Sequence, residues 1–477
     1  MKNILYDKIN LLCFIWLIPT LHFVLNPSYS LSSLPTWIAV LLSIFLSLKN
    51  KIILPLSIPF IALLSPLAVN GKILNLLPSE LFLLGLFFIG ILLFLLKRKT
   101  FITLLSGEKY LIALLILVFI SYIASLQFQV LFKSILSWIM IATVFCSTRV
   151  IIKSKENIDS YFFVIIVCTF YCSIITLVSF FNGIVLSDFV ESSIYNKQKM
   201  YYEDYLAFIR AGFFYTNIGY ITVPAAIISL MRSINSFAML NRLLYGALFT
   251  FFIAILFLMV EKTGLVALSI ALAFLFIINY LTPRLKAKKS KLIKLIFVSV
   301  APFFGYLVFT LISTISNYEI SAGGFSQRLC VFNSTLKVLV QYPLRFLFGF
   351  GPDSSNIINN KLTQSAKVNC SGISEGAIDS GHMTFLFDYG LIFALIFILF
   401  LIHCSYGIYK KIKISPDQKT FYAILLGITI YFNFAALTDV VGTSKVAWII
   451  SQFFAIIVIS LTYNLNSSKS EMRKSVV

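Results

Sequence analysis

The stretch "EGAIDSGHMTFLFDYGLIFALIFILFLIH", Glu375–His403, joins a polar segment directly to a long apolar one. The apolar part is long enough for a helix that crosses a bilayer, which needs about 20 residues. Asp379 and His382 lie at its polar start, and Asp388 lies about 9 Å beyond His382 at 1.5 Å per helical residue. An ionisable side chain at such a boundary needs a partner or water, so these three residues are functional candidates.

The composition extends this interpretation to the whole chain. Of its 477 residues, 59% are hydrophobic and 12% charged, with a mean hydropathy of +0.95, whereas soluble domains carry about 25% charged residues. We expect an all-α polytopic membrane protein of about 12–14 transmembrane helices, because a helix satisfies its own backbone in lipid. The run from Leu11 is expected to stay as a helix rather than be removed as a signal peptide. The expected spans are 11–25, 36–48, 52–69, 81–96, 110–126, 130–147, 161–181, 214–231, 243–260, 265–281, 295–315, 383–402, 421–437 and 446–461.

The charge pattern predicts the orientation. The formal net charge is +20, and Lys and Arg accumulate in cytoplasmic loops. Alternation from a cytoplasmic N-terminus places basic runs such as 284–291 inside and also makes the C-terminus cytoplasmic. We expect the whole chain, 1–477, to form a single membrane domain. Its loops 182–213 and 316–382 then lie on the outer side of the membrane, and only the second could form a small subdomain. This basicity indicates orientation and attraction to anionic lipid rather than nucleic-acid binding.

Motifs of soluble chemistry are missing. The sequence has no HExxH, GxxxxGK[ST] or GxSxG, and its seven cysteines show no metal-binding spacing, so we expect neither a metal nor a cofactor. Cys168 and Cys172 are expected to be small core residues. Cys330 and Cys370 share the larger outer loop, where a disulfide and two free thiols both remain open.

Basic and polar side chains gather on the predicted outer face. They are Arg210, Asn217, Lys262, Arg328 and Arg345, joined by Asp379 and His382. Each has a plainer explanation. Arg210 could be an interfacial anchor, Arg328 a solvated loop residue, and His382 an interfacial residue with no functional role. Lys262 could pair with Glu261. The glycines of the turn Gly349–Pro352 are expected to serve the turn rather than to cradle phosphate.

Taken as a set, these residue types favour one chemistry. The arginine fork binds phosphate oxygens bidentately and stays charged. A carboxylate or histidine near a sugar hydroxyl can act as a general base. Cations also stabilise an anionic leaving group. Transfer of a glycan from a lipid pyrophosphate at the outer leaflet requires these groups together.

Four segments resemble the O-antigen polymerase and O-antigen ligase superfamily. "RAGFFYTNIGY" resembles its Arg-x-x-Gly-x-Phe-x-x-x-Asn segment, with one residue fewer between Arg and Gly. "QRLCVFNSTLKVLVQYPLRFLFGFGPDS" resembles its Arg followed by a Pro-led Gly-x-Gly turn. "DSGHMTFLFDYGLIFALIFIL" resembles its closing helix, with an acid just before Gly. "LFLMVEKTGLVALSIAL" departs from it, because Glu-Lys-Thr-Gly replaces Ser-Arg-Gly.

The resemblance implies a GT-C-like glycosyltransferase of the bacterial inner membrane, with the large periplasmic loop before the third-last helix and an active site facing the periplasm. Its substrate would be oligosaccharide linked to undecaprenyl pyrophosphate, and no cofactor would be needed. A chain-length regulator, a flippase and membrane lipid would be its partners. Arg210 and Arg328 would hold pyrophosphate, with Asn217, Lys262 and Arg345 as further substrate-binding residues. Asp379, His382 and Asp388 would be the candidate bases.

The segment around His382 favours a polymerase over a ligase. Ligases of the superfamily show Asn, Ser or Gln after the histidine and a more distant glycine, whereas here Met383 follows and Gly390 comes sooner. In a polymerase, Asp379 would be the better base. A ligase and a capsule or exopolysaccharide polymerase stay open. A flippase is the rival class, but it would show two similar halves and charges through the membrane centre.

Overall fold

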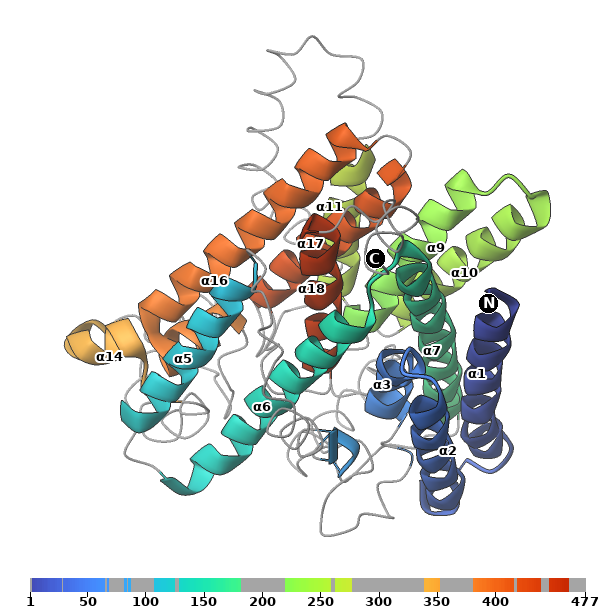
Figure 1. The fold of residues 1–477 in the computed structure, drawn as a ribbon, viewed down its shortest axis with the longest axis horizontal. Coiled ribbons are helices and arrows are strands. Elements are labelled where there is room, and N and C mark those ends of the chain that lie inside the picture. The colour runs from blue at the N-terminus through green and yellow to red at the C-terminus, as the bar shows by residue number, and fades with distance from the viewer. Residues whose placement is uncertain are drawn as a thin grey trace, which may run out of the picture. The chain divides into compact units, whose positions relative to one another are not determined.

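A computed structural model gives the structure of part of the chain (Figure 1). The regular structure within the described residues is helical, without strands. This confirms the all-α prediction for the described part of the chain. The described residues are 2–27, 29–64, 67, 81–83, 85–86, 107–124, 128–181, 219–258, 262–276, 339–351, 381–415, 418–438 and 446–462.

The helices follow the apolar runs of the sequence. They are α1 (Lys2–Leu25), α2 (Tyr29–Lys49), α3 (Ile53–Leu64), α5 (Glu108–Ala124), α6 (Phe128–Ile151), α7 (Lys155–Phe181), α9 (Gly219–Asn235), α10 (Met239–Leu258), α11 (Lys262–Phe276), α14 (Pro343–Phe348), α16 (Gly381–Ile414), α17 (Lys419–Thr438) and α18 (Val446–Thr462).

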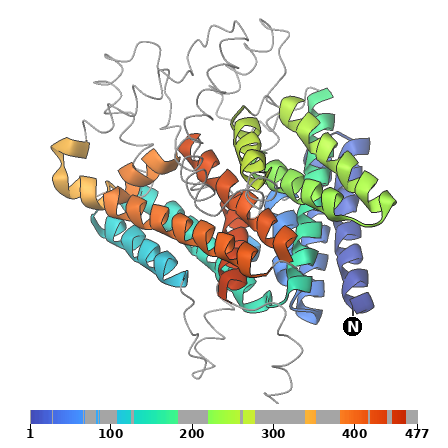
Figure 2. The same cartoon turned by 90° about the horizontal axis from the view of Figure 1, so that it is seen from above.

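Four of the described helices are long and apolar enough to cross a membrane. These stretches are Tyr6–Leu25 in α1, Lys155–Ser179 in α7, Met239–Leu256 in α10 and Phe385–Ile414 in α16. Shorter apolar helices accompany them, among them α3 and α18. Figure 2 shows these helices from a second direction. The larger number of spans and the cytoplasmic termini stay predictions.

The chain divides into two compact units. Unit 1 consists of residues 1–102, 140–265 and 445–477, and unit 2 of residues 103–139 and 266–444. Unit 1 therefore holds α1, α2, α3, α7, α9, α10 and α18, and unit 2 holds α5, α14, α16 and α17.

In unit 1, α1 packs beside α2, α3 and α7 (Figure 1). The Trp16 ring stacks on Phe60 of α3, with centroids 5.9 Å apart, and its indole N–H donates to the Ser43 hydroxyl of α2 at 3.0 Å. Cys168 and Cys172 are buried free thiols of α7. They are small core residues, as the sequence predicted.

A buried glutamine in unit 1 ties α18 to α3, α7 and the part of α6 that belongs to this unit. Pro59 has no N–H, so the carbonyl of Pro55, one turn earlier in α3, loses its helical donor. The Gln452 amide of α18 donates to that carbonyl at 2.8 Å and to the Thr148 hydroxyl of α6 at 3.3 Å. Its oxygen accepts the Tyr161 hydroxyl of α7 at 3.3 Å. We call Gln452, Pro55, Thr148 and Tyr161 the Gln452 node.

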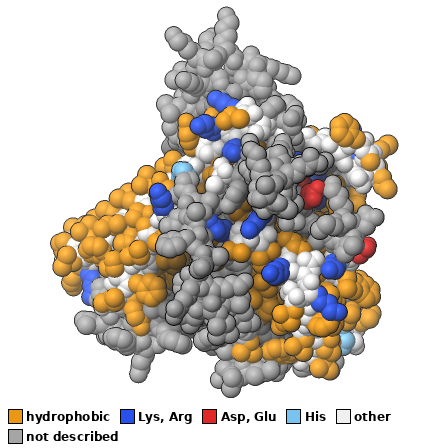
Figure 3. All heavy atoms as spheres, viewed as in Figure 1, with side chains coloured by type: hydrophobic (Ala, Val, Ile, Leu, Met, Phe, Trp, Pro, Cys, Tyr) orange, Lys and Arg blue, Asp and Glu red, His pale blue; other side chains and the backbone are white. Residues whose placement is uncertain are grey.

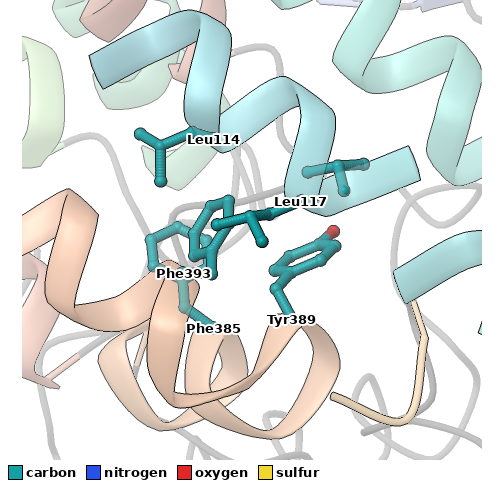
Figure 4. Packing of buried hydrophobic residues seen from close by; sticks show 6 residues of the cluster. Leu114, Leu117, Phe385, Tyr389 and Phe393 are labelled. Atoms are coloured by element: carbon teal, nitrogen blue, oxygen red, sulfur yellow. The ribbon is translucent and has the colours of Figure 1, made fainter. Parts of the chain in front are cut away.

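In unit 2, α16 packs along α5 (Figure 4). Leu114, Leu117 and Val118 of α5 meet Phe385, Tyr389 and Phe393 of α16 in one buried apolar cluster. Further along, the Tyr110 ring contacts His403 with centroids 5.5 Å apart. The two helices therefore run antiparallel, as expected for spans that enter from opposite sides.

The predicted outer loops are described only in part. The segment 182–213 lies outside the described residues. Of the segment 316–382, the structure describes 339–351 and the first two residues of α16. The short helix α14 and the turn after it belong to this part and lead directly to the candidate site.

Candidate functional site

The structure describes two of the predicted site residues in full, Asp388 and Arg345. His382 lies in the first turn of α16, and Lys262 is the first residue of α11; only their backbone is described. The predictions for Arg210, Asn217, Arg328 and Asp379 fall outside the described residues, as do those for Cys330, Cys370 and Glu261.

Two glycine-containing motifs that lie far apart in sequence meet in unit 2. The backbone N–H of Phe350 donates to the carbonyl of Phe387, and that of Gly351 to the carbonyl of Asp388, both at 2.9 Å. The turn after α14 is thereby joined to α16. We call residues 349–351 together with residues 387–390 the clasp.

A break in α16 makes these carbonyls available. Gly390 has φ 86° and ψ 175°, so the helical path is interrupted there. Carbonyls in the turn before such a break lose the N–H groups that normally lie four residues on. The clasp supplies replacements from the backbone of the turn. A third donor, the Ser121 hydroxyl of α5, reaches the Asp388 carbonyl at 2.6 Å.

The clasp requires glycine at two positions. Gly349 and Gly390 both have positive φ, a region that other residues rarely adopt. A Cβ on Gly349 would lie 2.1 Å from the Asp388 carbonyl oxygen, and one on Gly390 would lie 2.2 Å from the Leu347 carbonyl oxygen. Each glycine therefore lets the other segment's backbone approach. Gly349 and Gly351 are turn glycines, as expected, but Gly349 also serves this contact.

Aromatic rings cover the clasp and bring Arg345 to it. The rings of Phe350 and Phe387 stack with centroids 4.7 Å apart, and Tyr342 meets Phe350 edge-on at 5.8 Å. The Arg345 guanidinium lies 5.9 Å from the centre of the Phe350 ring, within the range of cation–π attraction. Arg345 and Asp388 are thus held on adjoining segments.

Asp388 and Tyr389 lie on the buried side of the clasp. Only 3% of the surface of Asp388 is exposed, whereas a general base must come within hydrogen-bonding reach of its substrate. The catalytic role expected of Asp388 therefore depends on substrate reaching this buried side chain, and it stays a prediction. The Tyr389 hydroxyl accepts the Trp138 indole N–H at 2.7 Å, and its ring packs against Phe393 (Figure 4).

Sequence reasoning missed Ser121, Trp138 and the pairing of the two motifs. Each glycine motif was visible by itself, as a turn and as an acid before a glycine. Their backbone pairing uses no side-chain type that a pattern could reveal. Within the described residues, no group of three or more His, Cys, Asp or Glu side chains is arranged to hold a metal ion.

A scan of the chain against models of known protein families finds no match, and a search of curated proteins finds none either.

Proposed function

We propose that this protein is a membrane-embedded glycosyltransferase that polymerises a glycan carried on undecaprenyl pyrophosphate, of the O-antigen polymerase type. Its site would face the periplasm at the inner membrane, within a bundle of about 12–14 spans of GT-C-like arrangement with cytoplasmic termini. The four long apolar helices support a membrane protein. The finer topology is part of the proposal.

The clasp is the observation that carries the proposal. It joins the Gly349–Gly351 turn to the Asp388–Gly390 break. These belong to two of the segments that resemble the superfamily, and Arg345 is held beside them. A cation on a fixed turn at the head of an apolar helix suits a lipid-borne phosphate. Such a site needs rigid support, because displacement by about 1 Å can cost two orders of magnitude in rate.

The reaction follows from the residue types. A hydroxyl oxygen of the acceptor sugar attacks the anomeric carbon of the donor and forms the new glycosidic bond. The bond from that carbon to the phosphate oxygen breaks, and undecaprenyl pyrophosphate leaves with the electron pair. The hydroxyl proton passes to a base, for which Asp379, His382 and Asp388 are the candidates. Arg210, Arg328 and Arg345 stabilise the charge on the leaving group.

Deletion of the gene, with inspection of surface glycan on a gel, tests the reaction. A polymerase predicts single repeat units on lipid A–core in the deletion strain. Bare core, with polymer kept on its lipid carrier, would indicate a ligase instead. A loss of all lipid-linked repeat from the periplasmic face would indicate a flippase.

Complementation then tests the residues at matched protein level. We expect Arg210→Ala, Arg328→Ala, Arg345→Ala and Asp379→Ala to shorten or abolish the ladder, because each removes a phosphate ligand or the base. Arg242→Ala is the matched control, since Arg242 is exposed in unit 1 and donates to Ser236. A normal ladder from all four site variants would overturn the proposed site.

A further inference from the structure

The short helix α14 leaves an apolar surface uncovered. None of its six residues, Pro343–Phe348, is buried, although five of them are apolar. The exposed fractions are 67% for Val340, 52% for Tyr342, 74% for Leu344 and 37% for Leu347. A helix this short is unstable by itself in water. The clasp holds it in place, and its outward surface needs a matching environment.

The clasp also fixes the level of α14 along α16. Its hydrogen bonds end on Phe387 and Asp388, at the start of the stretch Phe385–Ile414 that is apolar enough to cross a membrane. α14 therefore lies beside the first turns of that stretch. This is the level at which a membrane helix passes from headgroups into hydrocarbon.

The exposed surface of α14 continues into that of the neighbouring helices. On α16, Leu395, Leu399 and Ile402 are exposed, and on α5, Ile116 and Ile123 are exposed. Figure 3 shows hydrophobic side chains gathered over this part of the molecule. A membrane helix turns such side chains to lipid. A surface continuous with them has the same surroundings.

The polar residues in α14 and directly before it fit the membrane boundary. Tyrosine is enriched where headgroups meet hydrocarbon, and arginine extends its charged end from apolar surroundings toward phosphates. Tyr342 and Arg345 supply both residue types within one turn. The positive charge of Arg345 complements lipid phosphate. A protein partner would have to cover α14 and also the long exposed sides of α16 and α5.

We propose that α14 is an interfacial helix, embedded in the bilayer boundary at which α16 enters, with Leu344 and Leu347 in hydrocarbon and Arg345 at the headgroups. The occupant of its exposed surface is membrane lipid. This requires only that α16 spans the membrane and does not depend on the glycosyltransferase reaction. It adds a second membrane attachment to unit 2, immediately beside the clasp.

Spin-label accessibility in the full-length protein, reconstituted into phosphatidylcholine vesicles, tests this placement. Cysteines are introduced singly at Leu344 and Leu347 in a background where Cys146, Cys330 and Cys370 are serine. Molecular oxygen concentrates in hydrocarbon, whereas a charged nickel chelate stays in water. Gln341, exposed on the preceding turn, is the control near water, and Leu395 on α16 is the reference in lipid.

The ratio of oxygen accessibility to nickel-chelate accessibility at 344 and 347 should differ from the ratio at 341 and approach the ratio at 395. A ratio like that at 341 would place α14 in water and overturn the proposal. Low access to both reagents would mean that protein covers the helix, either a second copy or another partner, and would overturn it equally. Retained thermal stability of each labelled protein shows that the fold is intact.

Discussion

The Gln452 node and the clasp repair the same kind of defect in different ways. In unit 1, Pro59 deprives the Pro55 carbonyl of a donor, and a side chain from another helix replaces it. In unit 2, Gly390 interrupts α16, and backbone N–H groups of a turn replace the lost donors. The first repair lies inside a packed bundle. The second joins a loop segment to a helix and so fixes the position of whatever that loop carries.

The comparison predicts that a substitution in the clasp destabilises the protein more than a substitution in the Gln452 node. Gly349→Ala places a Cβ against the Asp388 carbonyl and forces a strained φ. Strain and overpacking together should cost roughly 3 kcal/mol or more. We expect a large drop in thermal stability of unit 2 and loss of glycan polymer.

Gly85→Ala is the matched control for this substitution, because nothing lies within 4 Å of a Cβ at that position. Its stability should stay near that of the natural protein. Equal behaviour of the two alanine variants in thermal unfolding would mean that the clasp does not constrain the fold.

The Gln452 node should show an intermediate effect. Gln452→Leu leaves the Pro55 carbonyl and the Tyr161 hydroxyl without these partners. Gln452 makes three of these bonds, and at about 0.6 kcal/mol for each in membrane helices the expected cost is about 2 kcal/mol, within the range for lost buried hydrogen bonds. Thermal unfolding in detergent measures it.

A double-mutant cycle with Pro59→Ala sharpens this prediction. Alanine at 59 restores an N–H to the helix, so the Pro55 carbonyl regains a partner within α3. Gln452→Leu should then cost less than it does beside Pro59. Additive effects of the two substitutions would show that Gln452 does not compensate for the proline.

Ser121→Ala should have the smallest effect. It removes one of two donors to the Asp388 carbonyl, while the N–H of Gly351 remains. The expected loss is about 1 kcal/mol, with the glycan ladder preserved. A loss as large as that of Gly349→Ala would mean that α5, rather than the turn, holds the break in place.

The sequence was sufficient for features that repeat along a segment. Apolar runs predicted α7 and α16, and the glycines near 350 predicted a turn. It was insufficient for contacts made by backbone atoms, such as those of Phe350 and Gly351, because these leave no pattern in residue types. The link between the Pro59 segment and Gln452 was equally unpredictable, since nothing in either segment indicates the other. The roles of Asp379 and Arg328 stay predictions.

The clasp also bears on how this chain can vary. Its two hydrogen bonds to α16 use backbone atoms alone, so they constrain the identity of Asp388 and Phe387 only weakly. What they constrain is the absence of a side chain at positions 349 and 390. Related sequences can therefore drift widely at this site and keep its architecture, provided that two glycines stay at matching places. Likeness between such relatives would fall to the level of spacing, where comparison of whole sequences has little to detect.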